Sequence, residues 1–95
     1  MTAQIEVRRT QSADPLQFAV TVTEGRSQSR HHVSLAQADC ARLGEGGHAP
    51  EACIAAAFRF LLDREPKESI LARFDVSVIQ RYFPEFEREL PRYFA

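Results

Sequence analysis

Residues 50–64 read PEACIAAAFRFLLDR, and this stretch decides the fold. Pro50 suits the first position of a helix, and the carboxylate of Glu51 is favourable in the first turn, because the N-terminal end of a helix carries partial positive charge. Apolar side chains cover most of the circumference, and the polar exceptions are Glu51, Arg59, Asp63 and Arg64. Such a helix is normally buried on more than one side. We therefore expect a central helix that a sheet covers on one side and that the C-terminal segment or a second subunit covers on another.

Upstream, three stretches alternate between apolar and polar residues with the period of two that is typical of strands. They lie at residues 5–8, 16–23 and 30–35, and the middle one alternates most strictly. Turn residues separate them, because Asp14-Pro15 disfavours helix and Gly25 suits a hairpin connection. The first thirty-five residues thus predict an antiparallel meander with one face covered.

Short helices are expected on both sides of the central one. Ser34 and Gln37 have the spacing of a capping box, which predicts a helix from there to the glycine-rich residues 44–47. Residues 67–74 indicate another short helix, whose inward side chains are Ile70, Leu71 and Phe74. Asp75 is then expected as the N-cap of the next helix.

These elements predict one α+β domain over residues 1–95. A three-stranded antiparallel sheet occupies residues 1–35, and three to four helices packed on one face occupy residues 36–95. A chain of this length has room for a single hydrophobic core.

Charge and hydropathy limit the classes of partner. The chain has 12 basic and 13 acidic residues, a formal net charge of −1, and both signs occur throughout, so broad nucleic-acid binding is disfavoured. No apolar run has the length of a signal peptide or a membrane span, and we expect a cytoplasmic protein without membrane association. In that compartment Cys40 and Cys53 are expected as reduced thiols.

Cysteine and histidine side chains raise two chemical alternatives. Zinc could take Cys40, His48 and Cys53 with His31 or His32, but neither cysteine has a second ligand two to four residues away. A cysteine nucleophile needs a positioned base and a lowered pKa, whereas both cysteines fall on apolar helix faces, where Cys acts as a small hydrophobe. We predict no catalytic residue, no metal site and no cofactor.

The C-terminal residues are the strongest candidate for an interaction surface. Five aromatic residues fall between positions 82 and 94 and alternate with arginines. Tyr, Phe and Arg are enriched at the centres of protein interfaces. Some of the rings are expected to cap the central helix, which leaves chiefly Tyr93 and Phe94 free for a subunit contact. The candidate surface comprises Arg81, Tyr82, Arg88, Arg92, Tyr93 and Phe94.

Residues 58–71 and 81–86 resemble stretches of a family of small uncharacterised bacterial proteins. The resemblance covers roughly the C-terminal half and implies a bacterial cytosolic protein, but it transfers no activity. The order of three strands followed by helices is also similar to that of antitoxins of the HicB type, at the level of element order alone.

The function expected from the sequence is a non-enzymatic protein-binding or regulatory module that acts through the C-terminal surface. The partner is an unknown protein or a second copy in a homodimer. The alternatives are a nucleic-acid-binding regulator of the antitoxin kind and a small enzyme that uses Cys53 or Cys40 with a histidine.

Overall fold

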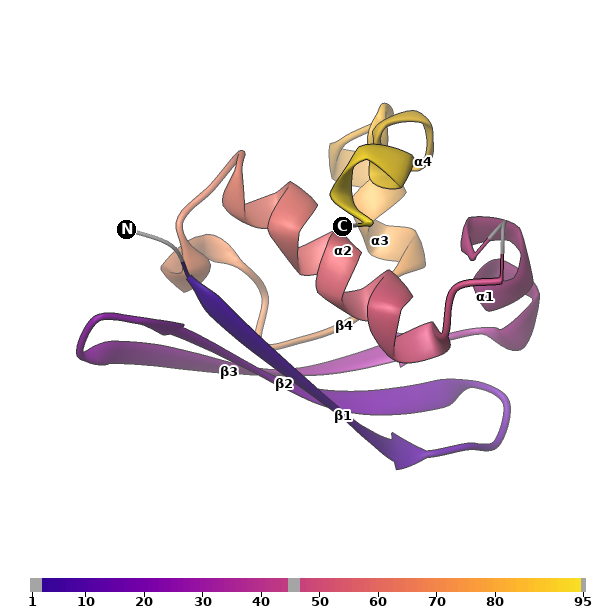
Figure 1. Ribbon diagram of the computed structural model, residues 1–95, viewed down its shortest axis with the longest axis horizontal. Coiled ribbons are helices and arrows are strands. Elements are labelled where there is room, and N and C mark those ends of the chain that lie inside the picture. Colours follow the sequence, from indigo (N-terminus) through magenta and orange to yellow (C-terminus); the bar gives the residue numbers. More distant parts are fainter. Residues whose placement is uncertain (1–2, 45–46, 95) are drawn as a thin grey trace.

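The computed structural model describes residues 3–44 and 47–94. It has two layers, a twisted sheet on one side and the helices together on the other (Figure 1). The predicted α+β class is therefore confirmed. No helix in the described ranges is long and apolar enough to cross a membrane.

Three antiparallel strands follow one another as predicted: β1 (Gln4–Gln11), β2 (Leu16–Glu24) and β3 (Ser27–Leu35). Gly25 makes the hairpin between β2 and β3 with φ of 58°, a left-handed conformation that glycine adopts without steric cost. The strict alternation of β2 buries four side chains against the helices, namely Leu16, Phe18, Val20 and Val22. The opposite face of the sheet carries the polar residues and has no helix over it (Figure 1).

A fourth strand corrects the expectation for residues 67–74. Instead of one helix, a 3-10 turn, η1 (Lys67–Ser69), precedes β4 (Arg73–Asp75), which pairs in parallel with β3. The N–H of His32 donates to Ala72 O at 2.7 Å. Backbone groups of this segment therefore bond to the edge of β3 instead of to one another within a helix. Of the side chains predicted to point inward, Ile70 is buried, Phe74 is half-buried and Leu71 is exposed.

The capping-box prediction is wrong. Helix α1 (Gln37–Leu43) has Ala36 at its N-cap, and Ser34 stays in β3, where its hydroxyl donates to Asp75 Oδ1 at 2.6 Å. A residue distant in sequence satisfies the helix start instead, because Gln37 N–H donates to Asp14 Oδ1 at 3.1 Å. Gly44 forms the C-cap of α1, in agreement with the predicted end.

Helix α2 (Pro50–Leu62) lies across the sheet, and its buried residues include Ile54, Phe58 and Phe60. Helix α4 (Phe86–Glu89) and the 3-10 helix η2 (Leu90–Tyr93) lie on the far side of α2 from the sheet (Figure 1). Helix α3 (Ser77–Tyr82) follows directly after β4 and contacts it. Both predicted covers of the central helix are therefore present within one chain.

Candidate functional site

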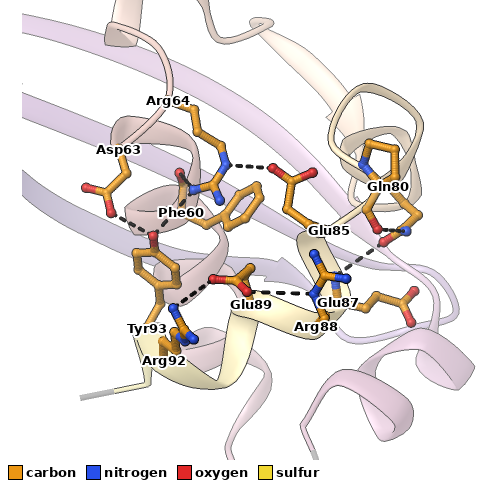
Figure 2. Close-up of polar contacts among 11 residues, drawn as sticks. Phe60, Asp63, Arg64, Gln80, Glu85, Glu87, Arg88, Glu89, Arg92 and Tyr93 are labelled. Atoms are coloured by element: carbon orange, nitrogen blue, oxygen red, sulfur yellow. Dashed lines mark hydrogen bonds and ion pairs between the residues drawn. The ribbon is translucent and has the colours of Figure 1, made fainter.

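Of the three rings expected at the interface, Tyr93 packs on α2. The ring of Tyr93 meets Phe60 edge-on with centroids 5.8 Å apart, and its hydroxyl donates to Asp63 Oδ2 at 2.6 Å (Figure 2). The Arg64 guanidinium lies 3.7 Å above the Phe60 ring and donates to Glu85 at 3.2 Å. This cluster joins the end of α2 to the C-terminal segment through aromatic contact and charge.

Three other members of the predicted surface make different contacts. Phe94 is half-buried and stacks on His48 with ring centroids 3.9 Å apart. Arg88 and Arg92 have side chains 78% and 77% exposed and both pair with Glu89 (Figure 2). Tyr93 and Phe94 thus contact side chains of the same chain, while Arg88 and Arg92 remain exposed.

A groove between β4 and α3 collects exposed apolar side chains. Among the described residues, the exposed large hydrophobic side chains are Leu71, at 51%, and Tyr82, at 71%, and both line this groove. Its volume is about 280 Å³, and Phe74 and Val78 contribute to its walls. The other lining residues are Leu61, Glu65, Ser69, Ile70, Ile79 and Phe83. Tyr82 is thus the one member of the predicted surface that lines the groove, and Arg81 precedes it on α3.

Buried polar contacts hold the wall that carries Leu71. His31 is only 5% exposed, and its Nδ1 lies 2.8 Å from Leu71 O, which can only accept. Nδ1 therefore donates to Leu71 O, and Nε2 lies within hydrogen-bond distance of the Ser29 hydroxyl, at 2.8 Å. The His31 ring also packs on Phe58, with ring centroids 5.2 Å apart.

Lys67 anchors the beginning of the same wall. Its side chain is 4% exposed, its ammonium lies 3.6 Å from Glu24 of β2, and it also bonds Glu68. The hydrogen bond to Glu68 holds the pKa of Lys67 above its ordinary value. A buried ammonium held by two carboxylates fixes η1 against the hairpin end of the sheet.

One carboxyl group lines the groove. Burial raises the pKa of Glu65, because partial removal from water disfavours the charged form. Glu65 therefore adds an acceptor to an otherwise apolar surface. The groove thus combines apolar walls with few polar groups, a composition suited to holding a side chain of another molecule.

The cysteines and histidines do not assemble a reactive centre. Cys53 is 2% exposed, and burial together with the neighbouring Cys40 thiol raises its pKa to about 11. A thiol with a raised pKa is a poor nucleophile at neutral pH. In the part of the chain that the structure describes, no group of three or more His, Cys, Asp or Glu side chains is arranged to hold a metal ion.

Two further hollows differ from the groove in their chemistry. One, of about 360 Å³, lies over β2 on the helix-free face and is lined by charged residues of both signs, including Glu6, Arg8 and Arg30. The other, of about 250 Å³, lies beside Phe94 and includes Arg42 and Glu87, which pair at 2.7 Å. Neither contains an exposed large hydrophobic side chain.

Sequence reasoning missed Leu71 as a surface residue. The apolar spacing of Ile70, Leu71 and Phe74 fits a helix, and a helix in that place would have directed Leu71 inward. The alternation of Arg73, Phe74 and Asp75 is the one local signal of a strand, and three residues are too few to distinguish the two periods.

Comparisons with protein-family models, curated proteins and solved structures give no match to this chain.

Proposed function

We propose that the chain is a non-enzymatic protein-binding module and that the groove between β4 and α3 is its contact surface. The observation that carries the proposal is the convergence of Leu71, from the segment between η1 and β4, and Tyr82, from α3, which expose their side chains in one groove. Contiguous exposed apolar side chains on a soluble domain mark interaction sites, and Tyr is enriched in protein interfaces.

The proposed contact surface shares some residues with the surface expected from the sequence and excludes others. Tyr82 and the adjacent Arg81 remain contact residues, and Leu71 joins them. Tyr93 and Phe94 serve instead as cover for the chain's own helices, because each already stacks on a side chain of the same chain. The buried Cys53 thiol, with its raised pKa, argues against the alternative of a cysteine-dependent enzyme.

A photo-crosslinking residue tests the groove in cells that make the protein. Benzoylphenylalanine replaces Tyr82 in one version and Arg88, an exposed residue outside the groove, in the other. We expect a discrete protein adduct at position 82 that is about tenfold stronger than at position 88, because only a bound partner lies close to the groove.

The substitution Leu71→Asp provides the specificity control. Leu71 is half exposed, so the variant is expected to fold, which circular dichroism verifies. Introduced into the position-82 version, it should remove the adduct, because a desolvated carboxylate opposes an apolar contact. Equal labelling at both positions, or an adduct that survives Leu71→Asp, would refute the proposed function.

A further inference from the structure

β4 has a free edge. It is the last strand in the sheet order β1-β2-β3-β4, so within the described part of the chain it has a neighbouring strand on one side only. Toward β3, Ala72 O accepts from His32 at 2.7 Å, and Val76 N–H donates to Ser34 O at 2.9 Å. Alternate residues of a parallel strand face the same neighbour, so the N–H and C=O groups of Arg73 and Asp75 point away from β3.

The free edge adjoins the groove. Phe74 of β4 pairs in register with the buried Val33, so its side chain lies on the helix-covered face, where it lines the groove beside Leu71. A strand added at this edge would direct every second side chain toward the groove, because side chains alternate between the two faces. β4 thus has outward-facing backbone groups at its edge and contributes to the groove through Phe74.

The residues on the opposite face of β4 indicate which charge a strand added at this edge would carry. Arg73 is exposed and, within residues 3–44 and 47–94, makes no ion pair or side-chain hydrogen bond. The Asp75 carboxylate is already engaged, because Ser34 donates to it at 2.6 Å and the Ser77 N–H at 3.0 Å. Opposite charges on adjacent strands attract, which favours an acidic residue opposite Arg73.

The other edge of the sheet is less suited to an added strand. The hollow beside β1 lies on the helix-free face and is lined by Glu6, Arg8 and Arg30 rather than by apolar side chains alone.

We propose that an extended segment of a partner protein adds to the free edge of β4 as a fifth strand. Alternate apolar side chains of that segment enter the groove beside Leu71 and Tyr82, and an acidic side chain of the opposite face meets Arg73. Main-chain hydrogen bonds supply affinity in this mode of recognition, and the pocket supplies specificity. The inference rests on the proposed function and adds the conformation and chemistry of the ligand.

A displayed library of random twelve-residue peptides tests the inference. Selection uses the full chain, and counter-selection uses Leu71→Asp, so that only groove-dependent peptides remain. We expect the selected peptides to alternate between bulky apolar residues and other residues, with Asp or Glu on the second face. Failure to recover any groove-dependent peptide would overturn both the proposed function and the added strand.

A backbone scan of one selected peptide separates the two proposals. Single N-methylation should lower affinity at least about tenfold at the two alternate residues whose N–H groups face the carbonyls of Arg73 and Asp75, and should leave the residue between them nearly unchanged. Two results would overturn the added strand and leave the proposed function standing. One is a set of groove-dependent peptides whose apolar residues recur every three or four positions, as in a helix. The other is a peptide whose affinity does not respond to N-methylation at alternate residues.

Charge exchange tests the contact with Arg73. Arg73→Glu should weaken the acidic peptide about tenfold, and a peptide with Lys in place of its acidic residue should recover the loss. Arg88→Glu, at a 78% exposed side chain on α4, is the matched control and should have no effect. Equal losses for both variants, or no recovery, would contradict the assigned register.

Sedimentation of the chain alone tests whether a second copy is the occupant. We expect a monomer, because the proposed ligand is a segment of another protein. A dimer that Leu71→Asp abolishes would identify the occupant as a second copy and overturn the partner-protein assignment.

Discussion

Phe58 joins the two layers of the domain at a single residue. Its ring is fully buried in α2 and lies 5.2 Å from the His31 ring and 6.0 Å from the Phe74 ring. Phe58→Ala should lower the free energy of unfolding by about 3 to 5 kcal/mol, because a buried ring is replaced by a cavity. Urea denaturation measures the loss, and Tyr82→Ala, at an exposed ring, should change stability by less than about 0.5 kcal/mol. Equal stability of the Phe58 variant and the parent would show that the ring is not part of the core.

Cys53 makes alkaline stability sensitive to pH. Its pKa is raised from 9.0 to about 11 in the folded chain, so the folded state favours the protonated thiol. The resulting stabilisation is complete below pH 9 and is lost as the pH rises to about 11, because the unfolded chain ionises first. The loss amounts to about 3 kcal/mol for two pKa units.

The substitution Cys53→Ala isolates this contribution. It removes the ionisable group, so the free energy of unfolding should fall less steeply between pH 9 and 11 than in the parent. The comparison uses slopes, because the small cavity lowers the stability of the variant equally at every pH. Parallel slopes would contradict a raised pKa in the folded state.

At the scale of elements, η2 stabilises the C-terminal half of α2. Tyr93→Phe removes the hydroxyl that bonds Asp63 at 2.6 Å and should cost about 0.5 to 1.5 kcal/mol. Tyr93→Ala also removes the edge contact with Phe60 and should cost about 0.5 to 1.5 kcal/mol more. Thermal or urea unfolding measures both, with Arg92→Ala as the exposed neighbouring control. No difference between Tyr93→Ala and the control would mean that η2 does not stabilise α2.

At the scale of the whole molecule, ion pairs and hydrogen bonds spread over several elements oppose acid unfolding. Four carboxyl groups have pKa values below their ordinary range: Glu51, Glu68, Asp75 and Glu85. A hydrogen bond from Arg9 lowers the pKa of Glu51, and a hydrogen bond from Lys67 lowers the pKa of Glu68. Burial raises the pKa of Asp75, but the hydrogen bonds that its carboxylate accepts lower it by more. Their stabilisation is present above the unfolded pKa values of 3.8 to 4.5.

The free energy of unfolding should therefore fall as the pH is lowered from 5 toward 2, through the depressed pKa values of the folded chain. Glu65, whose pKa is raised, acts in the opposite sense but is a single group. Urea denaturation at pH 3 and pH 7 measures the difference, and Glu85→Gln should make the dependence shallower, because it removes one depressed carboxyl. Equal stability at both values of pH would contradict the shifts.

Local periodicity was sufficient to determine the antiparallel strands and the central helix. The alternation of Leu16, Phe18, Val20 and Val22 and the apolar circumference of α2 are properties of neighbouring residues, so the sequence by itself determined α+β layers and a buried α2. It left two candidates for the other cover of α2, the C-terminal segment and a second subunit.

Only the tertiary structure decided β4, the position of Tyr93 and the groove. β4 forms because the edge of β3 supplies hydrogen bonds, and its Asp75 meets Ser34 across 41 positions of sequence. Leu71, which precedes β4, is exposed, and Tyr82 lines the same groove because α3 packs beside β4. Contacts between residues so far apart depend on which surfaces remain open after the layers assemble, and no local pattern of side chains specifies that.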